Sequence, residues 1–197
     1  MPDAGKPAVF AAGKLMIRID KPKDENTSVP KLIVNGSVES KGNVEIFNET
    51  FLTIQGDGAS LSAEGTLTVK GNPVIAVNNT GDGPAVQAGG NITIKDTAAV
   101  DAVSADQEAA IQTGGIIGIG GTASVTAVNH GDGCAMGQAP NTEEYSGEVR
   151  ISASTSPGGR PGAEYKAEDI QTYKYLKIRQ KIELSENPTV GDIDNLD

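Results

Sequence analysis

The sequence predicts an all-β protein, a right-handed parallel β-helix of about four 25-residue rungs with capping strands at both ends. Three observations predict it: a repeat without gaps, apolar positions two residues apart, and glycine-rich corners between them. Only 37% of the 197 residues are hydrophobic, and tryptophan is absent. This composition suits a narrow core of small aliphatic side chains better than a conventional globular core.

The repeat is the strongest signal in the sequence. Blocks 65–89, 90–114 and 115–139 align with one another without a gap, and each begins with glycine. Within the first two apolar clusters of each block, the positions lie two apart, as in a strand with one buried face. Stacked rungs would place the members of each column about 4.8 Å apart as parallel strands. The apolar columns are Leu67, Ile92 and Ile117; Val69, Ile94 and Ile119; Ile75, Val100 and Val125; Val77, Ala102 and Ala127; and Val86, Ile111 and Met136.

A fourth block, residues 42–64, fits the repeat if two residues are missing near 48–50. Its Val44, Ile46 and Leu61 then occupy apolar columns. Leucine-rich repeats are excluded because the three gapless blocks contain a single leucine. Helical repeats are excluded because β-branched residues and glycines fill the clusters. A left-handed β-helix is excluded because 25 is not a multiple of its six-residue period.

The triplet Gly-Asp-Gly marks the bend between the second and third strands of a rung. It recurs at 56–58, 81–83 and 131–133, and residues 106–108 take its place in the remaining rung. Asparagine and serine side chains can cap backbone groups that a corner leaves unpaired, and glycine supplies the positive φ that corners often need. We therefore expect a structural turn column before the triplet, made of Asn79, Ser104 and Asn129, with Ile54 in the first rung.

The aspartates of these triplets, Asp57, Asp82 and Asp132, are the candidate metal ligands. Stacked carboxylates near backbone carbonyls resemble the surroundings that calcium takes, but calcium requires six to eight oxygen ligands. One carboxylate per rung, interrupted by Gln107, falls short of that number, and the nine-residue GGxGxDxUx calcium repeat is absent. The sequence therefore favours structural turns and no cofactor, with a weak calcium site as the alternative.

Few residues offer catalytic chemistry. Lys70 and Lys95 share a column that ends at Gly120, whereas a polysaccharide lyase needs several acids converging on adjacent rungs. His130, the only histidine, stands in Asn-His-Gly rather than in the Gly-His-Gly of glycan hydrolases of this fold, and no Asp-Asp pair exists. Cys134 is expected to be a small wall residue rather than a nucleophile. The protein is therefore predicted not to be an enzyme, and a pectate-lyase-like or polygalacturonase-like enzyme is the alternative.

All four tyrosines lie toward the C-terminus: Tyr145, Tyr165, Tyr173 and Tyr175. Neutral sugars stack on aromatic rings, so these tyrosines are the candidate carbohydrate-binding residues. Tyr173 and Tyr175 would share one strand face. The favoured alternative is that they cover the open end of the coil.

Four segments are expected along the chain. The N-terminal segment forms a cap or partial rungs, the central segment forms the repeats, a strand pair or cap follows, and an acidic tail or linker ends the chain. The segments are 1–41, 42–139, 140–183 and 184–197. Strands are expected in the two flanking segments at 14–20, 31–40, 147–156 and 172–180.

The charge and the hydropathy pattern exclude several partners. A net charge of −10 argues against nucleic acid and against anionic lipid surfaces. No run of eighteen apolar residues exists, so no membrane span is expected. The opening MPDAGKPAVF is not a secretory signal, which predicts either a cytosolic protein or a part of a longer precursor.

The stretch GGNITIKDTAAVDAVSADQEAAIQTGG at 89–115, with GDGPAVQA and NHGDGCAM beside it, resembles repeats of β-helical carbohydrate-binding or adhesin-like modules of secreted bacterial surface proteins. The resemblance covers residues 56–139. It implies a non-catalytic, extracellular or cell-surface module of a larger multidomain surface protein, serving as a stalk or adhesin or binding a polysaccharide such as a host or cell-wall glycan. It also implies calcium affinity, although this chain has fewer acids per corner than the calcium-loaded members.

Overall fold

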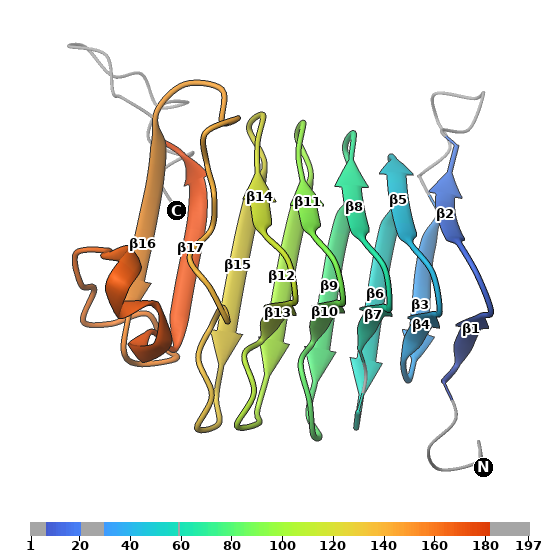
Figure 1. Ribbon diagram of the computed structural model, residues 1–197, viewed down its shortest axis with the longest axis horizontal. Coiled ribbons are helices and arrows are strands. Elements are labelled where there is room, and N and C mark those ends of the chain that lie inside the picture. Colours follow the sequence, from blue (N-terminus) through green and yellow to red (C-terminus); the bar gives the residue numbers. More distant parts are fainter. Residues whose placement is uncertain (1–6, 21–29, 59, 182–197) are drawn as a thin grey trace.

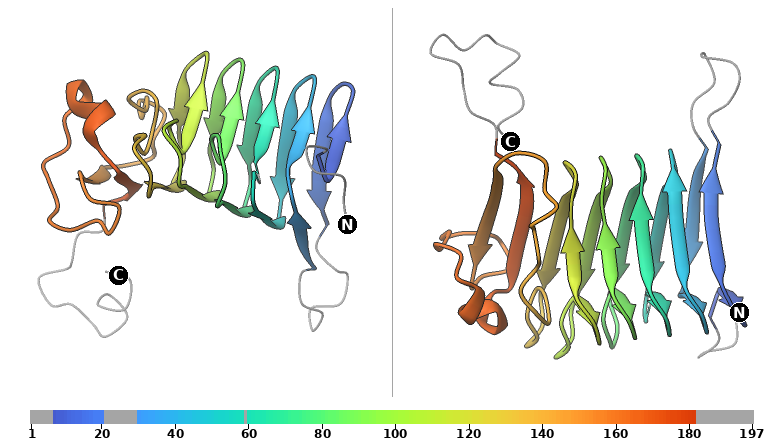
Figure 2. Two further views of the ribbon diagram at one scale, coloured as in Figure 1. Left: turned by 90° about the horizontal axis from the view of Figure 1, so that it is seen from below. Right: turned by 45° about the horizontal axis from the view of Figure 1, so that its top comes forward.

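The computed structural model describes residues 7–20, 30–58 and 60–181, and it is a parallel β-solenoid with three sheets running along its length (Figure 1). The predicted parallel β-helix is confirmed. Each rung contributes one strand to each sheet, and the rungs follow one another along the long axis (Figure 2). The described part of the chain contains a single helix, the short 3-10 helix η1 (Ala167–Thr172).

Three sheets, named here A, B and C, carry the rungs. Sheet A consists of β1 (Val9–Ala11), β4 (Val38–Ser40), β7 (Leu61–Ala63), β10 (Val86–Ala88) and β13 (Ile111–Thr113). Sheet B consists of β2 (Leu15–Ile19), β5 (Val44–Asn48), β8 (Leu67–Lys70), β11 (Ile92–Ile94) and β14 (Ile117–Ile119). The parallel part of sheet C consists of β3 (Lys31–Asn35), β6 (Phe51–Gly56), β9 (Val74–Asn79), β12 (Ala99–Ser104) and β15 (Ser124–Asn129).

The register of the strands confirms the predicted columns. Ile92 pairs with Leu67 on one side and with Ile117 on the other, as parallel neighbours in sheet B. The column of Val86 continues through Ile111, which forms an isolated parallel bridge to Met136. Strands form here because apolar side chains two residues apart point inward together, and the 25-residue spacing stacks those side chains into one core.

The predicted alignment of the first repeat block, residues 42–64, is wrong in its middle. The structure pairs Ile54 with Val77 and Gly56 with Asn79, so the two missing residues fall after Gly56 rather than at 48–50. Ile54 is fully buried in the core and does not belong to the turn column. Sequence alternation alone does not detect this error, because a shift of two residues leaves every side chain on the same face of the strand.

The core is a narrow stack of aliphatic side chains inside the three sheets. Its members include Ile46, Val69, Ile94 and Ile119 from sheet B, all at most 1% exposed. Residues of this size fill the space between sheets without large aromatic rings, as the composition predicted. Burying each such side chain contributes about 1.5–3 kcal/mol relative to leaving it in water.

The C-terminal end of the solenoid is closed by an antiparallel strand pair. β16 (Val149–Ser154) pairs with β17 (Tyr175–Gln180), and β17 pairs in turn with β15. Leu176 and Ile178 of β17 are fully buried against the last rung. The strands expected in 147–156 and 172–180 are therefore present and form the expected pair, whereas the predicted tail, 184–197, lies outside the described residues.

The strands expected in 14–20 and 31–40 are full members of the stack. β2 pairs in parallel with β5, and β3 pairs in parallel with β6, so the coil begins with these strands. The first rung comprises β1, β2 and β3.

The corner between sheets B and C contains a column of residues with left-handed backbone: Asn48, Gly71, Asp96 and Gly121, at φ values of 64°, 85°, 64° and 64°. The carboxylate of Asp96 accepts a hydrogen bond of 2.8 Å from the Gly71 N–H. A Cβ atom at Gly121 would lie 2.6 Å from the backbone nitrogen of Asp96. Glycine alternates with Asn or Asp because this corner has room for a side chain only on alternate rungs.

Candidate functional site

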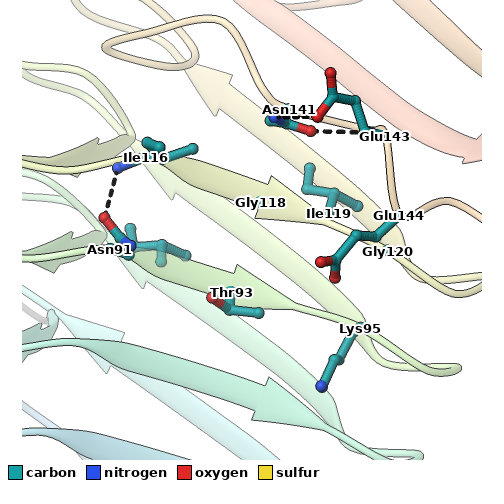
Figure 3. Close-up of a pocket in the computed structure, with 11 residues that line it drawn as sticks. Asn91, Thr93, Lys95, Ile116, Gly118, Ile119, Gly120, Asn141, Glu143 and Glu144 are labelled. Carbon is teal, nitrogen blue, oxygen red and sulfur yellow. Dashed lines mark hydrogen bonds between the residues drawn. The ribbon is translucent and has the colours of Figure 1, made fainter.

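A groove of about 390 Å³ lies on the outer face of sheet B near the C-terminal end (Figure 3). It runs over β11, β14 and the segment 141–144. The volume lies at the lower end of the range for small-ligand sites, about 300–1,000 Å³. Its lining is rich in amide, hydroxyl, ammonium and carboxylate groups.

The floor of the groove is free of side chains because a column of outward-facing threonines ends at Gly118. Thr68 and Thr93 face outward in successive rungs, and the next position in the same column is Gly118. A Cβ atom at Gly118 would meet only the carbonyl oxygen of Ile92, at 3.9 Å, so nothing in the packing requires glycine there. The missing side chain therefore leaves open space over β14.

The wall beyond β14 is the segment 141–144, which lies along the last strand of sheet B. The Asn141 N–H donates to the Ile117 carbonyl at 2.7 Å, and the Gly121 N–H donates to the Glu144 carbonyl at 3.0 Å. At Gly120 a Cβ atom would lie 3.0 Å from the Glu144 Cβ, so glycine lets the segment approach closely. These backbone contacts fix the backbone of residues 141–144, and so the positions from which the side chains of Asn141, Glu143 and Glu144 extend into the groove.

Charged and polar groups of both kinds meet in the groove. Figure 3 shows the carboxylate of Glu144 on the side of Lys95, while Glu143 lies beside Asn141. The Glu143 N–H donates to the Asn141 Oδ1 at 2.9 Å, and the Asn141 Nδ2 donates to the Glu143 Oε2 at 3.3 Å. At the other end, the Asn91 Oδ1 accepts a bond of 3.0 Å from the Ile116 N–H. The groove therefore offers hydrogen-bond donors, acceptors and one exposed aliphatic side chain, that of Ile116.

The sequence did not reveal this groove. It singled out Lys95 and Gly120, but it did not bring Glu143 or Glu144 beside them. Glu143 and Glu144 follow the end of the repeat, where no apolar period remains to position them over sheet B. The available signal was local: Gly118 stands where the preceding rungs have threonine.

The predicted turn column lies inside the corner between sheets C and A. The Asn79 Nδ2 donates to the carbonyls of Asp82 and Gly83, each at 3.0 Å, and its Oδ1 accepts from the Gly81 N–H at 2.9 Å. Asn129 accepts from the Gly131 N–H at 2.7 Å. The third member, Ser104, is fully buried, and among the described residues its Oγ has no partner.

The aspartates proposed as calcium ligands do not form one column. Asp57, Asp82 and Asp132 are all exposed, and Asp57 Oδ1 lies 1.9 Å from where a Cβ atom of Gly81 would be. Asp57 therefore lies over Gly81 rather than in line with Asp82, because of the displaced register of the first block. Within residues 7–20, 30–58 and 60–181, no three His, Cys, Asp or Glu side chains gather in a way suited to a metal ion.

The rung that contains β12 replaces the triplet with a different contact. The carboxylate of Asp106 accepts a bond of 2.8 Å from the Gly83 N–H of the preceding rung. Backbone hydrogen bonds hold the pKa of Asp106 below its usual value. The bond from the Gly83 N–H has the largest effect, and the bond from the Gln107 N–H has the next largest.

We expect the thermal midpoint of the protein to be the same with a calcium chelator as with added calcium, because the corner aspartates act as turn residues. A thermal scan in both buffers measures this. A midpoint several degrees lower with chelator would instead indicate a bound calcium ion, and Asp82→Asn with Asp132→Asn would then remove the difference.

The four tyrosines are differently placed. Tyr173 is 3% exposed, and its hydroxyl accepts from the Lys166 N–H at 3.0 Å and donates to the Glu164 carbonyl at 3.2 Å. The ring of Tyr165 lies beside it, with centroids 5.9 Å apart. Tyr173 therefore packs inside the C-terminal cap, which is the role of covering the coil, and it is not available for stacking on a sugar.

The remaining two tyrosines lie on other parts of the surface. The Tyr145 hydroxyl donates to the Ala123 carbonyl at 2.7 Å, which ties the segment after the groove wall to the solenoid. Tyr175 is half-buried at the start of β17, opposite Val128 of β15. Tyr145, Tyr165 and Tyr175 are each partly exposed, so these three tyrosines stay candidate sugar contacts.

Cys134 and His130 show no arrangement for nucleophilic catalysis. The Cys134 thiol is 6% exposed, and burial raises its pKa. Its Sγ lies 3.1 Å from the Met136 carbonyl oxygen, and Cys134 is a buried residue of the solenoid wall. His130 is exposed at a corner.

A scan against protein-family models found no matching family, and searches of curated proteins and of solved structures found no match. None of the helices in the described residues is both long and apolar enough to cross a membrane.

Proposed function

We propose that this chain is a non-catalytic β-solenoid module that binds a polysaccharide in the groove over Gly118. The observation that supports the proposal is the groove itself, a hollow with a side-chain-free floor and polar walls on an otherwise regular sheet. In this proposal the solenoid is a stalk or adhesin of a secreted or cell-surface protein, in keeping with the repeats that its sequence resembles.

The chemistry of the groove suits a sugar. Hydroxyl groups both donate and accept hydrogen bonds, and the amides of Asn91 and Asn141 offer both functions within one hollow. The exposed side chain of Ile116, 56% accessible, offers an apolar contact for the C–H face of a pyranose.

The test is to fill the floor. Gly118→Thr should weaken retention on the bound polysaccharide at least about tenfold, because its side chain would occupy the hollow, where a Cβ atom meets only the Ile92 carbonyl oxygen at 3.9 Å. The same substitution should leave the fold intact or stabilise it by up to about 1 kcal/mol, since threonine suits a strand better than glycine. A glycan array of the wild-type chain identifies the polysaccharide, and affinity electrophoresis compares the variants.

The matched control is Ala76→Thr. Ala76 faces outward on sheet C between Thr53 and Asp101, so the variant adds the same kind of side chain to a different face. Binding by Gly118→Thr as strong as that of Ala76→Thr would contradict a ligand in the groove. Absence of any ligand on a broad glycan array would contradict the binding function itself.

The second candidate is a polysaccharide lyase or hydrolase. One observation favours it: Lys95, Glu143 and Glu144 line the same groove, and an enzyme of this fold is expected to bring acidic and basic groups together. Both glutamates are exposed, so they lack the desolvation that strengthens electrostatic catalysis. Incubation with polygalacturonate and a glycan panel decides between the two. If the wild-type chain forms new reducing ends or unsaturated products and Glu144→Gln does not, the chain is an enzyme and the proposal of a non-catalytic binding module is wrong.

A further inference from the structure

We infer that the bound polysaccharide is a neutral one, and that it extends from the groove on sheet B across a corner of the solenoid into a second hollow on sheet A. This inference rests on the proposed function and names the extent of its site and the class of its ligand. The second hollow has a volume of about 410 Å³. It lies over β13, the corner residues 107–109 and 132–134, and Gln171 of η1.

The second hollow is built in the same way as the groove on sheet B. Gln87 and Gln112 face outward in successive rungs of sheet A, and the next position in this column is Gly137. A Cβ atom at Gly137 would first meet the Cβ of Ala109, at 3.6 Å, so the packing does not require glycine there. In both sheets, a column of outward polar side chains therefore ends at a glycine with open space above it.

The hollow on sheet A presents polar groups that are available to a ligand. Gln112 is half-buried, and its side-chain amide makes no hydrogen bond to another described residue. The carboxylates of Glu108 and Asp132 are exposed and have no ion-pair partner in the part of the chain that the structure describes. One wall is fixed, because the Gln171 Nε2 donates to the Gly137 carbonyl at 2.6 Å. Amides and carboxylates accept from hydroxyl groups, and amides also donate to them, so this hollow suits a sugar as the groove does.

The two hollows adjoin across the corner between β13 and β14 (Figure 1). Thr113 lines the hollow on sheet A, and Ile116 lines the groove on sheet B. The chain between these two residues spans at most about 10 Å. Gly137 borders the hollow, and residues 141–144 of the same continuous segment border the groove. One extended polymer chain therefore reaches both.

The corner between the hollows, Gly114 and Gly115, has no side chain of its own. At the position of Gly114, two earlier rungs have Lys41 and Glu64, which form an ion pair of 3.5 Å, and the rung between has Gly89. Stacking requires glycine in the later rungs, because a Cβ atom at Gly114 would overlap the Gly89 carbonyl oxygen. The close stacking of these rungs thus leaves a bare ridge that a bound chain crosses.

The charge of the two hollows selects the class of polysaccharide. Their described lining residues include four carboxylates and a single ammonium group: Glu108, Asp132, Glu143, Glu144 and Lys95. All four carboxylates are exposed. This excess of negative charge repels uronate-rich or sulfated polymers, whereas the hydroxyl groups of neutral sugars donate hydrogen bonds to carboxylates. The ligand is therefore a neutral polysaccharide.

Oligosaccharides of increasing length test the second hollow. The probes are cello-, xylo- and manno-oligosaccharides, and titration calorimetry measures their affinities. Gln112→Ala should weaken binding of the longest oligosaccharide about fivefold, the loss of one hydrogen bond, and leave the shortest bound oligosaccharide unaffected. Gln87→Ala is the matched control, since Gln87 occupies the same column one rung earlier and does not line the hollow. Its affinities should equal those of the wild type.

Gly137→Thr is a second variant, which fills the hollow and should weaken binding of the longest oligosaccharide at least about tenfold. If Gly118→Thr weakens binding while Gln112→Ala and Gly137→Thr do not, the second hollow is not used, and the proposed function stands without this inference. If Gly118→Thr has no effect, or no oligosaccharide binds, the proposed function falls together with it. Polygalacturonate that binds the wild-type chain as tightly as the neutral oligosaccharides, and Gly118→Thr more weakly, would overturn the choice of a neutral ligand.

Discussion

Gly121→Ala is expected to lower the free energy of unfolding by about 3–5 kcal/mol, from the strain of a left-handed non-glycine residue and from steric overlap. The new Cβ atom would lie 2.6 Å from both the backbone nitrogen and the backbone oxygen of Asp96, and 2.8 Å from its Cα. Backbone atoms held in a hydrogen-bonded corner do not move as cheaply as the end of a flexible side chain. Chemical denaturation of wild type and variant measures the difference.

The matched control for this prediction is Gly58→Ala. Its φ of +66° nearly equals the +64° of Gly121, but no atom lies within 4 Å of the added Cβ. Gly58→Ala should therefore lower the free energy of unfolding only by the strain of a left-handed alanine, about 1 kcal/mol. Equal losses at the two glycines would show that the overlap with Asp96 contributes nothing.

Gly121→Ala should also affect the groove. The N–H of Gly121 holds the carbonyl of Glu144 at 3.0 Å, so displacement of this corner displaces the wall. We expect weaker glycan binding by the folded fraction of Gly121→Ala, and unchanged binding by Gly58→Ala.

Asn129→Ala is expected to cost about 1–3 kcal/mol, because two backbone groups lose their partner. The fully buried amide of Asn129 accepts from the Gly131 N–H at 2.7 Å and donates to the Glu108 carbonyl. Alanine fills less of the corner and replaces neither hydrogen bond. Thermal and chemical denaturation both report this loss.

Ser104→Ala is the counterpart in the same column, and the opposite result is expected. The buried Oγ of Ser104 has no partner among the described residues, so its removal takes away an unsatisfied polar atom. The variant should be as stable as wild type or more stable by up to about 1 kcal/mol. A loss at Ser104 as large as that at Asn129 would contradict the role assigned to the asparagine amide.

The core columns were predictable because their information is local and repeated. Leu67, Ile92 and Ile117 recur at a constant spacing, and alternation by two tells which face of each strand is buried. The same alternation failed for Ile54, which was assigned to the turn column, because a shift of two residues preserves the face. The missing residues fall in a loop, where no periodic pattern marks their position.

The candidate site was largely invisible in the sequence. Glu143 and Glu144 lie after the last repeat block and have no equivalent positions in it. Only the pairing of residues 141–144 with β14 brings them into the groove that Lys95 also lines. Tyr173 was expected on a strand face, whereas the 3-10 helix before it turns its ring into the cap. The left-handed corner column was hidden as well, since Asn48, Gly71, Asp96 and Gly121 share a conformation rather than a residue type.

The sequence by itself determined the parallel β-helix and, in the three gapless blocks, the residues that fill its core and the positions of its corners, because each depends on spacing along the chain. The tertiary structure decided where the chain leaves the repeat to form the groove wall and which tyrosine is buried. These features depend on contacts between segments without a common period, and such contacts are fixed by packing and hydrogen bonding across the stack.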